Sequence, residues 1–299
     1  MMSGRVSAWL AIGRIGVFLG FCCVARGESR EIAISSVESP YQNGRQEIRV
    51  LLPDGYVETK RYRVLYVLPV EPGFQDQFGY GLGTLQRMGA HNLYDIIIVQ
   101  MGFEKVPWFG DHASDSKIRQ ASFLTEFVVP FIEDRYSTLA SPEGRLLLGF
   151  SKSGWGAFSL LLTYPDFFGY AASWDAPLCL SEFHFGMDKV FGTLPQLERY
   201  RPDLLLPKRK AFFRTKTRLV LMGENLWGNM VPVETGRSHT QRAHELLEQE
   251  GIKHIYDDSL VAPHRWDSAW LAPVLEALLQ IAGGRQNAAE GAFDSVPAN

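Results

Sequence analysis

The strongest chemical signal in this chain is Ser151, which lies in the sequence LLLGFSKSGWGA at residues 146–157. An apolar run ends at this serine and a segment rich in small residues follows it, as in a nucleophile elbow. In that device a strained turn between a strand and a helix exposes the serine hydroxyl, and small neighbours let the helix pack close to the strand. The usual pattern is G-x-S-x-G, and Ser153 stands at its last glycine position. The pattern predicts that Ser151 is a nucleophile.

Local context separates this match from chance ones. The G-x-S pattern occurs three times, beginning at Gly27, Gly149 and Gly236. Only the match at Gly149 follows a run typical of a buried strand, at residues 145–150, and precedes apolar residues at the three- and four-residue spacing of a helix. The context therefore selects Ser151.

A serine hydroxyl needs a base, and the usual base is a histidine that a carboxylate holds in place. His264 is the best placed histidine after Ser151, because it follows the last predicted strand, 254–256, and precedes an amphipathic helix. Three other histidines compete in this part of the chain. His184 lies in a predicted insertion at 178–215, and His239 and His244 lie at the start of a predicted helix and within it, where a surface or packing role is expected. We expect His264 to be the base.

The residues alone leave the acid open among three carboxylates. Glu224 and Glu234 lie in the loop between Met222 and the predicted helix cap at Ser238, and Asp175 directly follows an earlier strand. In the chain order serine, acid, histidine, each of the three stands in the right interval.

Backbone amides are expected to stabilise the oxyanion that forms during acyl transfer. One donor is the N–H of Lys152, immediately after the nucleophile, and the other comes from the loop after the strand at 62–69, at Val70 or Glu71. We expect Lys152 and Val70 to be the two donors.

These residues require a sheet that brings the ends of several strands together. Predicted strands alternate with helical segments, which indicates βαβ units, a mostly parallel sheet and a three-layer α/β fold. The strands are predicted at 47–52, 62–69, 94–101, 145–150, 170–174, 219–222 and 254–256. Helices are predicted at 118–136, with a kink at Pro130, and at 240–249. The candidate residues follow carboxyl ends of strands, where function collects in such sheets.

The chain is predicted to consist of a leader, one domain and a tail. Residues 1–27 read as a signal peptide, with arginines before an apolar run and small residues before a cleavage site after Gly27, so export to the periplasm or the medium is expected. The domain spans 28–282 and includes an insertion at 178–215, with a short helix between 188 and 200, that we interpret as a partial lid or a surface decoration. Residues 283–299 read as a disordered tail.

Composition excludes several functions. The formal net charge of −3 falls to −6 without residues 1–27, which argues against nucleic acid as a partner. The apolar run of the leader is too short to span a bilayer, so no membrane span is expected after cleavage. Cys179 is the single cysteine of the mature chain, so an internal disulfide is excluded. The histidines show no metal-ligand spacing, and neither a metal nor an organic cofactor is expected.

Two strings give the chain a family resemblance: GFSKSG at 149–154 and HRWDSAW at 264–270. With them the chain resembles the esterase-D-like group of α/β hydrolases over roughly residues 45–282. This group includes enterochelin esterases, feruloyl and acetyl-xylan esterases, S-formylglutathione hydrolase and the antigen 85 mycolyltransferases. The resemblance implies an α/β-hydrolase fold. It also favours Glu234 as the acid, because the acid-to-histidine spacing of enterochelin esterases and antigen 85 matches Glu234 and His264.

The resulting hypothesis is an exported serine carboxylic-ester hydrolase that forms an acyl-enzyme on Ser151 and acts on a small-molecule or carbohydrate-linked ester. An acyltransferase that uses the same acyl-enzyme is one alternative. The other is a non-catalytic protein on a hydrolase scaffold, with an aromatic wall for a sugar or another ligand. That wall would consist of Trp108, Phe109, Trp155, Trp174 and Trp266.

Overall fold

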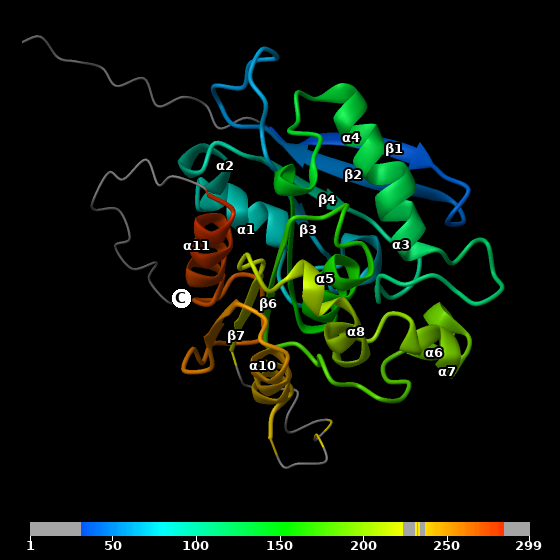
Figure 1. Ribbon diagram of the computed structural model, residues 1–299. Helices are drawn as coiled ribbons and strands as arrows, with labels where there is room; N and C mark the ends of the chain where they lie inside the picture. The colour runs from blue at the N-terminus through cyan, green and yellow to red at the C-terminus, as the bar shows by residue number, and fades with distance from the viewer. Residues whose placement is uncertain (1–30, 224–230, 232, 234–236, 284–299) are drawn as a thin grey trace, which may run out of the picture.

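An eight-stranded sheet forms the centre of the molecule (Figure 1). The computed structural model describes residues 31–223, 231, 233 and 237–283. The strands are β1 (Ala33–Glu38), β2 (Arg45–Leu51), β3 (Val64–Val67), β4 (Ile97–Met101), β5 (Arg145–Phe150), β6 (Tyr170–Trp174), β7 (Leu219–Met222) and β8 (His254–Asp257). The seven predicted strands are confirmed, and β5, β6 and β7 have the predicted bounds. β1 was not predicted, because its side chains are exposed or only partly buried and give no core pattern.

The sheet is mostly parallel, and its strand order is β1-β2-β4-β3-β5-β6-β7-β8. β1 and β2 pair antiparallel with their neighbours, and all strands from β4 to β8 are parallel. The chain runs from β3 to β4 on one side and then returns to β5 on the other side of β3. The crevice at such a reversal, outside the carboxyl ends of the strands, is where open α/β sheets bind ligands.

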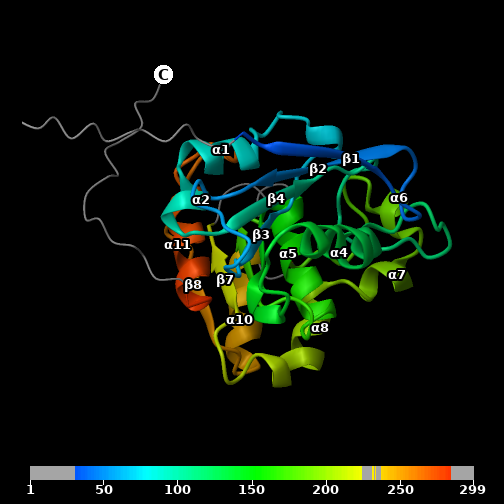
Figure 2. The same cartoon turned by 90° about the horizontal axis from the view of Figure 1, so that it is seen from above.

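Helices cover both faces of the sheet, so the fold has the predicted three layers (Figure 2). The principal helices are α1 (Gly81–Arg87), α2 (Ala90–Leu93), α3 (Gln120–Ser122), α4 (Val129–Arg135), α5 (Ser151–Thr163), α6 (Met187–Phe191), α7 (Leu194–Glu198), α8 (Pro202–Arg209), α10 (His239–Gln249) and α11 (Leu271–Ile281). Side chains of α1, α2 and α11 belong to the core on one face, and those of α4, α5, α8 and α10 to the core on the other.

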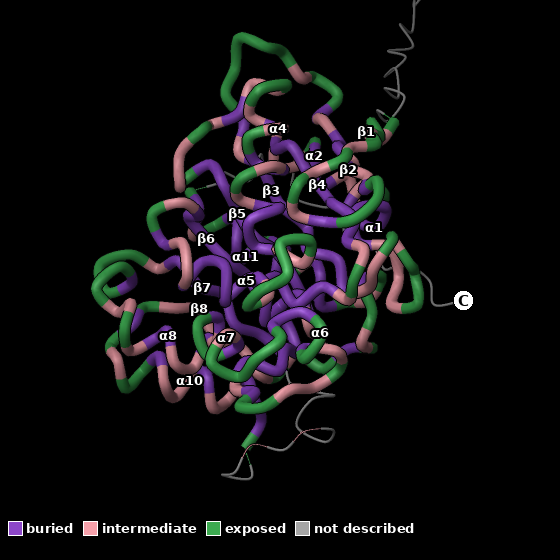
Figure 3. The backbone as a smooth tube through the Cα atoms, turned by 90° about the vertical axis from the view of Figure 1, so that its right-hand side faces the viewer, coloured by how far each residue is buried: buried purple, intermediate pink, exposed green. Residues whose placement is uncertain are grey.

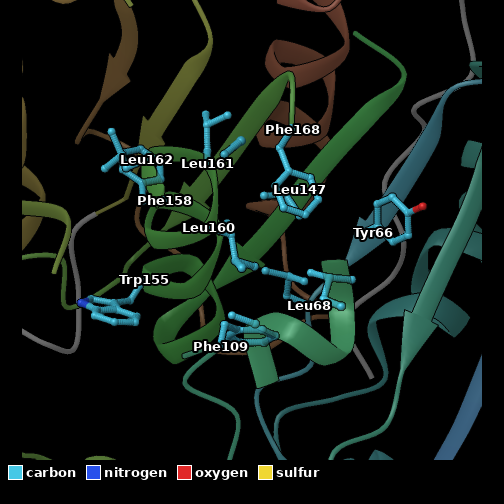
Figure 4. Packing of buried hydrophobic residues seen from close by; sticks show 14 of the residues in the cluster. Tyr66, Leu68, Phe109, Leu147, Trp155, Phe158, Leu160, Leu161, Leu162 and Phe168 are labelled. Atoms are coloured by element: carbon cyan, nitrogen blue, oxygen red, sulfur yellow. The ribbon is translucent and has the colours of Figure 1, made fainter. Parts of the chain in front are cut away.

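Alternation along the central strands creates these two cores. In β3, Val64 and Tyr66 join the larger cluster, whereas Leu65 and Val67 join the cluster under α11. Every residue of β3 to β7 is buried, as expected for strands that are covered on both faces (Figure 3). Figure 4 shows part of the larger core, where Leu160 of α5 lies close to Leu68 at the end of β3. This rigid sheet fixes the strand ends from which the site is built.

The region 118–136, predicted as one kinked helix, consists of two α-helical segments with a π-helical segment between them. A π-helical segment, η2 (Phe123–Val128), joins α3 to α4 and lies just before Pro130. Proline has no N–H to bond the carbonyl four residues earlier, so a change in the hydrogen-bond pattern there is expected, and it takes the form of a π segment. The segment from Pro72 to Leu85, for which no helix was predicted, holds a 3-10 turn, η1 (Pro72–Phe74), and the first part of α1.

The insertion at 178–215 contains more structure than the one short helix predicted. It forms α6, α7, α8 and a 3-10 turn, η4 (Lys210–Phe212), and α8 packs against α5 and α10. Apolar side chains of all three helices are buried, including Val190, Leu197 and Leu206. The helices of this segment thus contribute to the packed core, and its role as a lid over the site stays a prediction.

The predicted signal peptide at 1–27 and tail at 283–299 lie outside the described residues, apart from Gly283 at the end of the last turn. Among the residues that the structure describes, no helix has the length and hydrophobicity needed to cross a membrane.

Candidate active site

Ser151 occupies a strained turn between β5 and α5. It follows the last residue of β5 directly and has a φ of 54°, in the left-handed region that residues other than glycine seldom adopt. The helix packs so close to the strand that a Cβ on Gly149 would lie 2.2 Å from the Ser153 carbonyl oxygen. A Cβ on Gly154 would lie 2.6 Å from Ser173 Oγ. This is the geometry that the predicted elbow requires.

Ser153 fits the elbow although it replaces the usual glycine. Its side chain is fully buried and bonds Phe150 twice, accepting from the backbone N–H at 3.1 Å and donating to the carbonyl oxygen at 2.8 Å. These two bonds satisfy the hydroxyl and hold the first turn of α5 against the end of β5.

His264, which is largely buried, and Asp175, which is buried, form a pair at the same edge of the sheet. The Nδ1 atom of His264 lies 2.7 Å from Asp175 Oδ2. An ionised carboxylate only accepts hydrogen bonds, so Nδ1 carries the proton and Nε2 keeps a free lone pair. The side chains of His264 and Asp175 are 11% and 3% exposed, which shields their bond from water. The pair therefore holds the His264 imidazole in a fixed orientation with a defined tautomer.

Asp175 has its own strained backbone. It follows the last residue of β6 with a φ of 41°, and its N–H donates to the carbonyl oxygen of Met222 at 3.0 Å. This bond continues the pairing of β6 with β7 by one residue, so the carboxylate projects from an anchored position at the carboxyl end of the sheet.

An aromatic cluster connects the three candidate residues. Its members are Phe150, Trp174, Trp266 and Trp270. Phe150 precedes Ser151, Trp174 precedes Asp175, and Trp266 lies two residues after His264. The cluster is buried, so it fixes the relative positions of the serine turn, the acid and the histidine loop.

Contacts within the cluster explain the H-x-W-x-x-x-W string. The rings of Trp266 and Trp270 lie 5.0 Å and 5.4 Å from the Phe150 ring, and Trp270 stacks on Trp174 at 5.0 Å. The Trp270 indole N–H donates to the carbonyl oxygen of Arg265 at 2.6 Å. The two tryptophans thus dock the histidine loop on β5 and β6.

Aromatic rings also surround the His264 imidazole itself. Its centroid lies 5.0 Å from that of Phe150, 5.9 Å from that of Trp174 and 5.9 Å from that of Phe78. The backbone N–H of Trp266 donates to the Phe78 carbonyl oxygen at 2.8 Å. The segment after β3 therefore helps to hold the histidine.

The predicted oxyanion residues lie on two segments that an ion pair connects. Lys152 Nζ lies 2.8 Å from Glu71 Oε1, and both side chains are largely buried. Glu71 follows Val70, which is buried at the end of the β3 segment and lines a small hollow together with Phe78 and Trp266. The Lys152 side chain therefore connects the turn after β5 to the segment after β3.

The other candidate acids and His239 are not part of the His264–Asp175 pair. Glu224 and Glu234 lie outside the described residues. His239 is a packing residue, since its Nδ1 accepts from the Cys179 N–H and its Nε2 lies 2.8 Å from the Val231 carbonyl oxygen. Burial lowers the pKa of His239 below its ordinary value.

The aromatic side chains proposed for a ligand-binding wall are buried. All five aromatic residues of the proposed wall are at most 2% exposed. They are core residues, so they offer no surface to a sugar.

Cys179, the one cysteine among the residues that the structure describes, is largely buried. Burial raises the pKa of the Cys179 thiol to about 12, which keeps it protonated and unreactive at neutral pH.

Comparison with known proteins matches this chain to one family over most of its length. The family model described as "Putative esterase" covers residues 39–279. An esterase of Mycobacterium tuberculosis is 31% identical over 139 residues, which make up 44% of this chain. That segment is 29% of the relative's length, so the chain spans less than a third of it.

Solved structures of low sequence identity share the fold. A ferulic acid esterase superposes with a TM-score of 0.63 at 16% identity, over 85% of this chain and 98% of the other. MPT51 of Mycobacterium tuberculosis gives a TM-score of 0.64 at 15% identity, over 85% and 99%. An S-formylglutathione hydrolase from Staphylococcus aureus gives 0.62 at 16% identity, over 84% and 98%. These likenesses confirm the predicted α/β-hydrolase fold, and the family match shows that the chain belongs to the esterase family.

Proposed function

We propose that this protein is a serine carboxylic-ester hydrolase that acts through an acyl-enzyme on Ser151. The observation that carries the proposal is the 2.7 Å bond between His264 Nδ1 and Asp175 Oδ2, at the edge of the sheet where the strained Ser151 turn also lies. Membership of the esterase family supports the reaction class.

In this proposal Asp175, rather than Glu234, is the acid. An imidazole has one proton on Nδ1, and His264 donates it to Asp175, so the histidine has no second Nδ1–H to offer another carboxylate. Asp175 also precedes His264 in the chain, as the order serine, acid, histidine requires.

The reaction follows from these positions. Ser151 Oγ attacks the ester carbonyl carbon while His264 Nε2 takes its proton, and Asp175 stabilises the imidazolium that results. Collapse of the tetrahedral intermediate breaks the carbon–oxygen bond, and the alcohol leaves with the proton from His264. Water then attacks the acyl-enzyme by the same steps, which releases the acid and restores Ser151.

Two backbone amides hold the oxyanion in this proposal. The donors are the N–H groups of Lys152 and Val70, one from the turn after β5 and one from the segment after β3. The Lys152–Glu71 ion pair supports this assignment, because it joins those two segments next to both donors.

The substrate class proposed is small-molecule esters, including carbohydrate-linked ones. The fold relatives whose names state a substrate include a ferulic acid esterase and an S-formylglutathione hydrolase, and both names refer to small molecules. Hydrolysis of p-nitrophenyl acyl esters of increasing chain length measures this specificity directly.

Three single variants test the assignment of the acid. Asp175→Asn is expected to lower kcat for a p-nitrophenyl ester by about 10²-fold to 10⁴-fold, because the neutral amide favours the wrong imidazole tautomer. Glu224→Gln and Glu234→Gln are the matched controls and are expected to retain kcat within about threefold. Near-native activity of Asp175→Asn together with an inactive Glu234→Gln or Glu224→Gln would transfer the role to that glutamate.

We further propose that the protein is exported after cleavage behind Gly27. The support is the order of Arg5 and Arg14, the apolar run 15–25 and small residues at the cleavage site. Determination of the N-terminus of protein recovered from cell fractions tests this: a chain that begins at Glu28 outside the cytoplasm supports export, and an intact leader on cytoplasmic protein contradicts it.

A further inference from the structure

A second cluster of chemically competent side chains lies far along the chain from the proposed triad. It consists of His244 and Glu248 on α10 and His254 at the start of β8. One ligand atom from each side chain lies within 4.8 Å of the others. His254 pairs with Leu219, the first residue of β7, so the cluster lies at the amino end of these strands. Ser151 and Asp175 follow the carboxyl ends.

A backbone contact determines which nitrogen of His254 carries the proton and which one presents a lone pair to the cluster. Its Nδ1 lies 2.8 Å from the carbonyl oxygen of Ile252, which only accepts hydrogen bonds, so Nδ1 carries the proton. Nε2 is therefore unprotonated in the neutral ring. A histidine that binds a metal almost always donates its other N–H in this way. The His254 side chain is only 2% exposed, so its orientation is fixed by packing.

His244 supplies a second nitrogen at short range. Its Nδ1 lies 2.8 Å from His254 Nε2, and its ring stacks on Tyr256 with a centroid distance of 3.8 Å and an interplanar angle of 3°. With both rings neutral, one proton lies in the hydrogen bond between His244 Nδ1 and His254 Nε2. Transfer of the His244 proton from Nδ1 to Nε2 leaves both facing nitrogens unprotonated without a change in net charge.

Glu248 completes the set from the same face of the helix as His244. Residues four apart on a helix are neighbours, and Glu248 Oε1 lies 3.9 Å from His254 Nε2. Its side chain is 66% exposed and free to move toward the two rings. The cluster thus offers two neutral nitrogens and one carboxylate oxygen.

We propose that His244, Glu248 and His254 form a binding site for Zn²⁺, with water as the fourth ligand. Zinc accepts two histidines and a glutamate at about 2.0–2.2 Å in a tetrahedral arrangement. Such bonds place the two nitrogens roughly 3.3 Å apart, so the rings need to separate by about half an ångström. The ion replaces the proton that joins the rings and connects α10 to the edge strand β8.

The site was absent from the sequence prediction because its ligands do not form a compact motif. The signal is a histidine and a glutamate four residues apart, followed by a second histidine beyond the turn at Gly251. That turn returns the chain along α10 and brings His254 against the helix face.

Calorimetric titration of untagged, EDTA-treated protein with ZnCl2 tests the proposal. The expected result is saturable binding of one ion per chain, with a rise in Tm of roughly 5–10 °C when the free zinc concentration is a hundred times Kd. Substitution of Co²⁺ should give the visible absorption bands of a tetrahedral site.

Two variants that preserve the fold make the test specific. His244→Phe keeps a ring to stack on Tyr256 and removes the nitrogen, and Glu248→Gln changes an exposed side chain. Both should weaken zinc binding by at least about tenfold, whereas Glu250→Gln, on an acid that pairs with Lys210, should leave it unchanged. Absence of saturable binding, or equal affinity in wild type, His244→Phe and Glu248→Gln, would overturn the site.

Discussion

Two residues of the proposed triad, Ser151 and Asp175, have left-handed backbone conformations. Their φ angles are 54° and 41°, and both are almost completely buried. Such conformations are unfavourable for residues with a Cβ, by about 1–3 kcal/mol each, and persist only where the surrounding structure imposes them. Here β5 and β6 end directly before these residues, so the sheet holds them in place.

Replacement of Ser151 by glycine should therefore stabilise the protein relative to replacement by alanine. Both variants lose the hydroxyl and its interactions, but only glycine relieves the left-handed strain. The free energy of unfolding of Ser151→Gly is expected to exceed that of Ser151→Ala by about 1 kcal/mol, measured by urea denaturation. Equal stability of the two variants would show that the turn is not strained.

The candidate triad shows which catalytic residues can be predicted from a single sequence. Ser151 and His264 follow strands in recognisable strings, and the structure brings His264 to an acid. The choice among Asp175, Glu224 and Glu234 depends on which strand end the histidine loop covers, and chain spacing carries no such information. The family spacing favoured Glu234, whereas the bond in the structure is made by Asp175.

At the scale of elements, packing of the aromatic cluster gives the physical reason for the H-x-W-x-x-x-W motif. Trp266 and Trp270 pack on Phe150 and Trp174, so the spacing H-x-W-x-x-x-W is a packing requirement of the histidine loop. Buried strands were predicted well because continuous apolar runs are distinctive. β1 and α1 were missed because an exposed edge strand and a short helix rich in glycine give no clear period.

The Lys152–Glu71 ion pair is expected to keep two elements in register during catalysis. Lys152→Met removes the cation that ties the β5 turn to the segment after β3, without removing either backbone donor. We expect kcat to fall by about tenfold with little change in KM, since a misplaced donor should cost less than the loss of one, which is worth a hundredfold or more.

Glu71→Gln is the matched control for this prediction, because its amide oxygen can still accept a bond from Lys152. It should retain kcat within about threefold. If Lys152→Met lowered Tm but left kcat unchanged, the pair would have only a structural role.

For the molecule as a whole, buried histidines predict a loss of stability in mild acid. Burial lowers the pKa values of His91 and His239 below that of an unfolded histidine, about 6.5. As the pH falls through 6.5 the unfolded chain binds protons that the folded chain resists, so the free energy of unfolding decreases. The slope is expected to approach about 1.4 kcal/mol per pH unit for each such histidine.

Urea denaturation between pH 7 and pH 5 measures this slope. His91→Gln and His239→Gln should each reduce it, even if the variant is less stable at pH 7, because each removes one proton-binding group from the unfolded state. A wild-type stability that is constant or increases toward pH 5 would contradict the prediction.

The central claim is that Ser151 is a nucleophile activated by the His264–Asp175 pair. The most direct measurement is reaction of the purified protein with a fluorophosphonate, followed by mass-spectrometric mapping of the adduct. We predict one adduct per chain, on Ser151, that is absent in Ser151→Ala and strongly slowed in His264→Gln. An adduct on another residue, or ester turnover that Ser151→Ala leaves intact, would contradict the account.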